Sequence, residues 1–304
     1  MSIKEASEKW GISDSRIRLL CRQGRVEGAR KIGRSWTIPK DVAKPIDGRE
    51  RIKKAYLGLQ YDFTLIDSLK ERIDKERPLP KETVKSLREK LLVEWTYNSN
   101  AIEGNTLTIH ETKVVLEGIT VGGKSIKEHL EIINHRDAIL FLENLVSNKE
   151  AISEWNIRNI HSLILKEIDN QNRGRYRLEN VLISGATHIP PSHYELPDLM
   201  QELIGEYNTN WGAYHPVVRG ALLHGEFVKI HPFIDGNGRT ARLLLNFELM
   251  RGGYTPIVIK NRDKVQYYAA LDLAHTTMDY HPFIEMVAAL VVESEELWLK
   301  VLAR

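Results

Sequence analysis

The sequence lacks several features that would otherwise fix its class. It has one cysteine among 304 residues, Cys21, so no internal disulfide can form and a reducing compartment is favoured. No apolar run reaches the roughly 18 residues that a membrane-spanning helix needs, and the longest candidate, 286–292, is followed by Glu293. The opening segment MSIKEASEKW has no apolar signal core. We therefore expect a cytoplasmic protein that does not bind a membrane.

Two further absences exclude classes of function. The sequence contains no GxxxxGK(S/T) string, which excludes a P-loop nucleotide-binding enzyme. It also has no internal repeat and no low-complexity tract. Apolar residues make up 42% and charged residues 28%, a balance typical of a globular protein and not of a disordered or fibrous one.

The net charge of +2 is unevenly distributed along the chain. Residues 1–45 carry 11 Lys and Arg against 5 Asp and Glu, a net charge of +6. The remaining residues carry 32 against 36, a net charge of −4. A basic N-terminal region on a mildly acidic body favours contact between that region and a polyanion.

The N-terminal region reads as helix, turn, helix and basic hairpin. Helical spacing covers residues 3–10, and Ser13 is a plausible N-cap for a second helix over roughly 14–23. The next stretch alternates and contains two glycines, which indicates a short hairpin. This layout resembles the winged helix-turn-helix domains of the excisionase and MerR type. The resemblance implies binding of duplex DNA through Arg16, Arg18, Arg22 and Lys31. The alternative is a basic helical hairpin that only packs on the body.

The rest of the chain is mainly α-helical in pattern. Residues 44–51 combine proline, glycine and charge and read as a linker, and helical patterns then run from Ala55 to the C-terminus. Only residues around 180–191 and 256–260 look extended. We therefore predict a helical bundle with one small hairpin, divided into 1–45, a DNA-binding domain; 46–125, a linker with N-terminal helices; and 126–304, a catalytic core with C-terminal helices.

The segment HPFIDGNGRTAR, residues 231–242, gathers chemically useful groups. Because His231 precedes a proline, we expect it where a helix gives way to a loop. The DGNG turn lets backbone N–H groups approach a ligand, and the N-terminus of the following helix suits an anion such as a diphosphate. On that helix Arg239, Arg242 and Asn246 share one face. Each part alone has an ordinary structural explanation. Residues 281–283 repeat HPF without the glycine turn or the arginine pair, and we interpret them as structural.

This string matches the motif HPFx(D/E)GNGRxxR of the Fic family at every defined position, so the chain resembles that family. The resemblance implies transfer of AMP from ATP to a Ser, Thr or Tyr hydroxyl of a protein. His231 would be the general base, with an ordinary pKa of about 6.5. Asp235 would hold Mg²⁺, and Arg239 and Arg242 would hold the phosphates. The implied ATP-binding residues are Phe233, Gly236, Asn237, Gly238, Arg239, Arg242, Asn246 and Tyr268.

Residues 99–104, SNAIEG, resemble the inhibitory motif of the same family. The resemblance implies that Glu103, four positions after Ser99, pairs with Arg242 and excludes the γ-phosphate of ATP. The same letters also describe a helix C-terminus capped by Gly104 in the left-handed conformation. Both interpretations can hold together.

Residues 175–191 resemble the flap of the family, a β-hairpin over the active site. The resemblance implies that 180–187 pairs with the backbone of a target protein by strand addition. Tyr267 and Tyr268 are candidates to flank the adenine, although packing explains them equally well.

Three functions remain open from the sequence. The chain would be an AMP transferase restrained by Glu103, a de-AMPylase in which Glu103 orients a water, or a DNA-binding regulator whose body senses a nucleotide. The sequence leaves the target, the DNA site, the nucleotide base and the oligomeric state open, a homodimer included.

Overall fold

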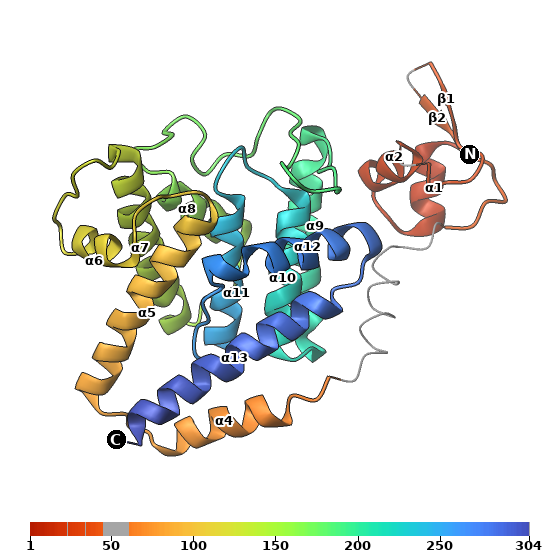
Figure 1. Cartoon of the computed structure of the whole chain (residues 1–304). Helices are drawn as coiled ribbons and strands as arrows, with labels where there is room; N and C mark the ends of the chain where they lie inside the picture. The colour runs from red at the N-terminus through yellow and green to blue at the C-terminus, as the bar shows by residue number, and fades with distance from the viewer. Residues whose placement is uncertain (23, 34, 45–60, 304) are drawn as a thin grey trace. The chain divides into compact units, whose positions relative to one another are not determined.

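Helices form most of the chain in the computed structural model, which describes residues 1–22, 24–33, 35–44 and 61–303 (Figure 1). The chain divides into two compact units, Met1–Tyr61 and Asp62–Arg304. Most of the predicted linker and the start of the helical pattern at Ala55 lie outside the described residues. No helix in the described part of the chain is long and apolar enough to cross a membrane.

The first unit contains α1 (Ile3–Trp10), α2 (Asp14–Arg22), β1 (Arg30–Ile32) and β2 (Ser35–Thr37). A capping box between Ser2 and Glu5 begins α1, and the Ser13 hydroxyl accepts a hydrogen bond from the Arg16 backbone at the start of α2. The two strands pair antiparallel. A cluster of buried side chains forms the core: Ile3, Ala6, Trp10, Ile17, Leu20, Cys21, Val26 and Ile38. The predicted order of two helices and a hairpin is confirmed.

The second unit is a bundle of helices. Its α-helices are α4 (Thr64–Lys75), α5 (Lys81–Ile102), α6 (Ile109–Leu116), α7 (Ile126–Ser147), α8 (Glu154–Ile164), α9 (Leu196–Thr209), α10 (Pro216–Ile230), α11 (Asn237–Arg251), α12 (Lys264–Thr277) and α13 (His281–Leu302). Short 3-10 helices are η1 (His193–Glu195), η2 (Trp211–Ala213) and η3 (Asn261–Asp263).

The helices α10 and α11 form the centre of this unit. They pack against each other (Figure 1) and are buried on nearly every side. Their inward residues include Leu222, Phe227, Leu244 and Phe247, all without exposed surface. Close packing of this kind leaves side chains and backbone little room to shift. The loop that joins the two helices, residues 231–236, is therefore held by a rigid frame.

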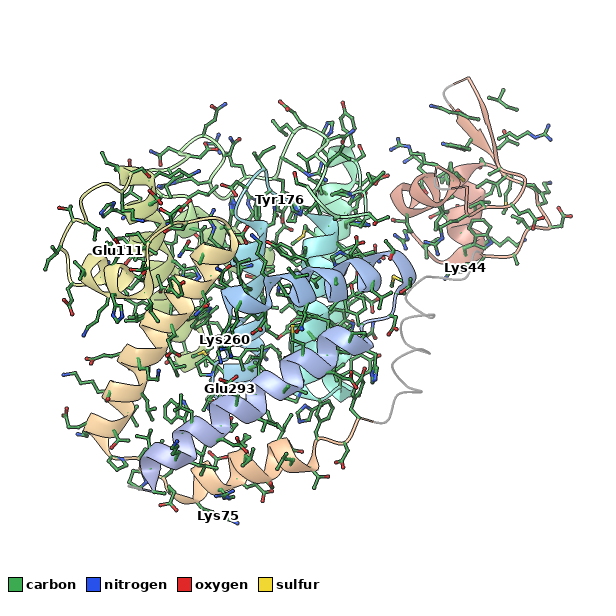
Figure 2. All side chains as sticks on the ribbon, viewed as in Figure 1. Lys44, Lys75, Glu111, Tyr176, Lys260 and Glu293 are labelled. Atoms are coloured by element: carbon green, nitrogen blue, oxygen red, sulfur yellow. The ribbon has the colours of Figure 1, made fainter. Side chains whose placement is uncertain are left out.

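Other helices surround this pair and bring the inhibitory segment to it. The helix α7 packs on α8 and α11, and α5 packs on α7 and α11, while α13 crosses α4. Lys260 and Glu293, labelled in Figure 2, form an ion pair that ties the segment before α12 to α13. The last turn of α5 buries Ser99, Asn100 and Ile102. Contacts of Ser99 with Arg242 and of Glu103 with Gly238 place the C-terminus of α5 at the start of α11.

The predicted β-hairpin of the flap is wrong. No residue of 175–191 lies in a strand, and β1–β2 is the one sheet within the described residues. The reason is that several flap backbone groups bond to side chains and not across a hairpin. The N–H groups of Thr187 and His188 donate to the Asp272 carboxylate at 2.8 and 3.1 Å. The other segment expected to be extended, 256–260, is also not a strand.

Candidate active site

His231 is the C-cap residue of α10, where the helix gives way to the loop of residues 231–236. Its backbone is left-handed, with φ of 50°, and its N–H donates to the Phe227 carbonyl at 3.0 Å. Pro232 follows, and the helix stops where the sequence predicted. Burial lowers the pKa of the imidazole to about 4. The ring is therefore neutral at pH 7, as a general base must be, but the expected pKa near 6.5 is wrong because the ring is desolvated.

Arg177 clamps the backbone on both sides of the site. Its Nε donates to the His231 carbonyl at 2.8 Å, and its backbone N–H donates to the Pro232 carbonyl at 2.9 Å. The two terminal nitrogens donate to the carbonyls of Glu179 and Pro191, at 2.7 and 2.6 Å. One buried guanidinium thus joins both ends of the flap to the catalytic loop. A planar guanidinium donates in several fixed directions at once, which the single ammonium group of lysine cannot do.

The loop between His231 and α11 is locked from within. The Asn237 amide oxygen accepts from the Phe233 N–H at 3.0 Å, and the amide nitrogen donates to the Phe233 carbonyl at 2.8 Å. The buried Phe233 ring stacks on His161, with centroids 3.6 Å apart. Both side chains that the sequence assigned to ATP therefore shape the loop in this structure. The backbone atoms of Phe233 and Asn237, and the edges of their side chains, remain predicted contacts of the nucleotide.

His161 on α8 supports the same loop by a hydrogen bond to its backbone. Its Nε2 bonds to the Asp235 carbonyl at 2.8 Å, and its Nδ1 receives the Gly174 N–H at 2.9 Å. Because a carbonyl only accepts and an amide N–H only donates, the proton must be on Nε2. Burial lowers the pKa of His161 to about 4, so this neutral tautomer persists at pH 7.

The N-terminus of α11 is the end of the site that suits an anion. Gly236 is the N-cap, with φ of 76°, a conformation that glycine adopts without strain. The first N–H groups of any α-helix lack an intrahelical acceptor and carry the positive end of the helix dipole. A Cβ on Gly238 would collide with the Glu103 carboxylate, which lies directly over this turn. Glu103 therefore lies where an anionic ligand would bind.

Two buried arginines complete the positive surface. Arg239, 2% exposed, lies 3.4 Å from both Asp235 oxygens and 3.6 Å from Glu131. Arg242, 3% exposed, donates to the Ser99 hydroxyl at 3.0 Å, to the Ser99 carbonyl at 2.8 Å and to the Glu103 carboxylate at 2.7 Å. The predicted Glu103–Arg242 pair is thus present. Within the described residues, Nε and Nη1 of Arg239 and Nη1 of Arg242 have no hydrogen-bond partner. Buried donors of this kind are normally satisfied, so they favour an anionic ligand here.

Two predicted ATP contacts lie differently from expectation. The Asn246 amide is buried and bonds twice to the Ile257 backbone, at 2.8 Å each. Both of its polar atoms are therefore used in holding the segment before α12. Tyr268 is 43% exposed, with the Lys264 ammonium 5.5 Å from its ring centroid. Its open ring face remains a candidate surface for a base.

Asp235 is the acidic residue of the loop. Its side chain is about half exposed, and one oxygen accepts the Gly236 N–H at 2.6 Å. The described residues contain no group of three or more His, Cys, Asp or Glu that would hold a metal alone. A single exposed carboxylate beside an anion site is the kind of ligand that Mg²⁺ takes together with phosphate oxygens.

His161 escaped the sequence analysis because it acts on backbone atoms of distant segments, which leave no pattern around position 161. Arg177 stands in the quoted flap segment, but its four-way contact depends on the fold. Glu131 was missed for the same reason.

The comparisons with known proteins agree with this geometry. The Fic/DOC family pattern matches residues 151–249. A protein adenylyltransferase Fic of Nematostella vectensis is 35% identical over 260 residues, 81% of this chain and 59% of that protein. Its namesake in Drosophila mojavensis is 40% identical over 205 residues, 67% of this chain and 40% of that protein. The crystal structure of a Fic domain containing signaling protein from Bacteroides thetaiotaomicron has a TM-score of 0.72 and 35% identity, over 79% of this chain and 98% of that chain.

A helical bundle that presents an HPF and DGNGR loop between two buried helices is a Fic fold. The chain belongs to the Fic/DOC family, because it covers nearly all of the matched solved structure and its diagnostic loop falls within the matched residues. It spans about 40 to 60% of the length of the two curated relatives.

Proposed function

We propose that the chain is a protein adenylyltransferase, which transfers AMP from ATP to a Ser, Thr or Tyr hydroxyl of a target protein and is restrained by Glu103. The observation that carries this proposal is the Glu103 carboxylate over the α11 N-terminus, paired with Arg242 at 2.7 Å. The site is built for an anion, and a carboxylate of the chain fills it. The names of the two curated relatives support the same chemistry.

The proposed reaction forms a bond between the target oxygen and the α-phosphorus of ATP. The bond from that phosphorus to the oxygen bridging the β-phosphate breaks, and pyrophosphate leaves. His231 takes the hydroxyl proton at Nε2, since its Nδ1 is buried. The N–H groups at the start of α11, with Arg239 and Arg242, stabilise charge on the phosphates.

Asp235 would hold Mg²⁺ together with phosphate oxygens of ATP. Its half-exposed carboxylate fits that role, because Mg²⁺ in nucleotide sites usually takes one or two carboxylates and keeps the rest of its ligands as phosphate and water. When bound, the ion would neutralise charge on the α- and β-phosphates.

The proposed restraint acts through α5. Its last turn supplies three acceptors to Arg242: the Ser99 hydroxyl, the Ser99 carbonyl and the Glu103 carboxylate. Of these, only Glu103 carries a charge and extends over Gly238. Removing its carboxylate frees the anion site without removing the Ser99 contacts.

The test is incorporation of label from [α-³²P]ATP into protein by the wild type and by Glu103→Gly. We expect at least a tenfold increase in Glu103→Gly, which His231→Ala in the same background abolishes. Glu89→Gly is the matched control, because Glu89 is an exposed residue in the middle of α5. It loosens the helix by about 1 kcal/mol without touching the site. Absence of label from every acceptor in Glu103→Gly would refute transfer of AMP.

A second arm tests the reverse direction. A target labelled by the Glu103→Gly variant is incubated with wild-type protein without ATP. Release of AMP by the wild type but not by Glu103→Gly, with no transfer by the wild type at any ATP concentration, would assign the chain to removal of AMP instead.

The first unit is proposed to bind duplex DNA. Arg18 and Arg22 of α2 and Lys31 of β1 are exposed, and Arg16 lies on the same helix. We expect the affinity for a DNA duplex to fall steeply with salt and to fall several-fold in Arg22→Glu. Lys4→Glu on α1 is the matched control for charge. Equal affinity of Arg22→Glu and the wild type would remove α2 from the interface, and no binding at low salt would refute the winged helix-turn-helix interpretation.

A further inference from the structure

A hollow lies in the surface of the second unit, formed by α8 and the segment that leads into the flap. Its volume is about 530 Å³, and its walls include Trp155, Arg158, Arg173, Gly174 and Arg175. None of these residues takes part in the proposed transfer of AMP. We call this hollow the arginine pocket.

The three arginines give the pocket an unbalanced positive charge. Arg158 donates to the Gly174 carbonyl at 2.7 Å, and Arg173 donates to the Asn170 amide oxygen at 3.1 Å. Both acceptors are neutral, and none of the three guanidiniums forms an ion pair with a carboxylate of the described residues. The one acid in the wall is Glu154. Burial, and then the charge of Glu154, raises the pKa of the Tyr176 phenol.

Trp155 adds a large apolar surface to the rim. Its side chain is 65% exposed, although it stands beside charged neighbours on a folded helix. Trp and Arg are the residues most enriched at the energetic centres of protein–protein interfaces. Their combination in one hollow indicates a binding surface for protein.

The charge of the surrounding chain decides which anion fits. Residues 62–304, which make up the second unit, carry a net charge of −6, so a long polyanion would be repelled outside the pocket. A short acidic stretch places its charge on the arginines alone. This contrast favours an acidic protein segment over nucleic acid.

The pocket is fixed to the frame of the active site by consecutive hydrogen bonds. Arg158 bonds to Gly174, the Gly174 N–H bonds to Nδ1 of His161, and Nε2 of His161 bonds to the Asp235 carbonyl. A Cβ on Gly174 would lie 3.0 Å from the Arg158 carbonyl, so the segment approaches α8 closely. A segment bound in the pocket is therefore held at a set position relative to the reacting groups.

We propose that the arginine pocket binds an acidic stretch of the target protein, beside the hydroxyl that receives AMP. This inference rests on the proposed transfer to a protein. The flap begins at the pocket, and Leu178 and Leu182 on it are 82% and 78% exposed. A target chain lying along the flap continues into the pocket, which adds selection by charge to contacts along the flap backbone.

The test measures binding of a fluorescein-labelled peptide that carries a run of Asp and Glu around one Tyr. The full chain should bind it, and Arg173→Glu with Arg175→Glu should weaken binding at least about tenfold, which corresponds to the loss of about 1.4 kcal/mol. Lys75→Glu with Lys300→Glu is the matched control, with the same charge change on exposed residues of α4 and α13. Figure 2 shows Lys75 and Tyr176 at opposite ends of the unit.

Three results would overturn the proposal. The first is unchanged affinity in the double Arg variant. The second is equal binding of a peptide with Asn and Gln in place of Asp and Glu. The third is tighter binding of a single-stranded oligonucleotide with the same dependence on Arg173 and Arg175. Arg175→Gln, which removes charge without reversing it, should weaken peptide binding to a smaller degree, and circular dichroism reports whether each variant is folded.

Transfer assays separate this proposal from the proposed function. In the Glu103→Gly background, the double Arg variant should raise KM for a Ser peptide with an acidic stretch and leave kcat unchanged. Peptide binding without transfer to any acceptor would refute the transferase and retain the pocket. Transfer with unchanged KM and unchanged binding would refute the pocket and retain the transferase.

Discussion

A carboxylate oxygen of Glu103 lies 2.7 Å from a guanidinium nitrogen of Arg242, which follows 139 positions later in the chain. Arg242 is buried, so its charge needs a partner in the resting protein, and Glu103 supplies it. Glu103 raises the pKa of Arg242 against the effect of burial. In the proposed mechanism, the same guanidinium binds the triphosphate. Glu103 would then both satisfy Arg242 at rest and compete with the ligand.

Replacement of His231 by alanine should abolish transfer and retain binding of ATP. In the proposed mechanism, the phosphates contact α11 and the two arginines, whereas His231 contacts the target hydroxyl. Loss of a positioned base costs about 10²–10⁴ in rate. Initial rates with [α-³²P]ATP and calorimetric titration with ATP, both in the Glu103→Gly background, measure the two effects. Unchanged rates would remove His231 from the chemistry.

Replacement of Arg177 by lysine should slow transfer by about 10²-fold. A lysine reaches one carbonyl at a time, so the flap and the His231 backbone lose their common clamp, and small misplacements of reacting groups are costly. Arg72→Lys, at an exposed position of α4, is the control. The assay is kcat for an acceptor peptide, together with limited proteolysis of the flap. Normal kcat with an intact flap would show that the clamp is dispensable.

The free energy of unfolding should fall as the pH is lowered from about 6.5 towards 4. Burial lowers the pKa of His161 and His231 to about 4, whereas the unfolded chain binds these protons near pH 6.5. Between these values the unfolded state holds more protons, so each histidine contributes up to about 1.4 kcal/mol per pH unit. Urea unfolding at pH 7.5, 6.5 and 5.5 measures this dependence. His161→Gln should reduce the slope, and His110→Gln, at an exposed position, should not. Equal slopes in all three proteins would contradict the pKa assignment.

The sequence predicts best where local chemistry determines the structure. Pro232 forces the end of α10 at His231, and the glycines after Asp235 start α11 with open N–H groups. Ser13 begins α2, and the hairpin that follows has Gly28 before its first strand and Gly33 between its two strands. Each of these features depends on neighbours within a few positions.

Predictions failed where the structure depends on contacts between residues far apart in the sequence. The flap looks extended in sequence, but Asp272 and Arg177 bond its backbone and replace the strand pairing of a hairpin. The spacing of Asn246 places it on the face of the arginines, yet its amide is taken by Ile257. The pKa of His231 depends on burial by the folded bundle, which the motif does not encode.

The central claim is that Glu103 inhibits by occupying the ligand site of Arg242, and not by bracing α5. Removing either partner breaks the ion pair, but the two changes have different consequences under this claim. Glu103→Gly frees the guanidinium for the γ-phosphate. Arg242→Ala also removes the group that the γ-phosphate needs. Arg242→Lys keeps a positive charge that supports folding, but it lacks the paired N–H groups with which a guanidinium binds a phosphate.

The most direct measurement is incorporation of label from [α-³²P]ATP by the wild type, Glu103→Gly, Arg242→Ala and Arg242→Lys in parallel, with folding checked by circular dichroism. Competition for the site predicts at least a tenfold rise in Glu103→Gly and no rise in either Arg242 variant. Activation of Arg242→Ala to the level of Glu103→Gly would contradict the account, because loosening of α5 from either side would then suffice.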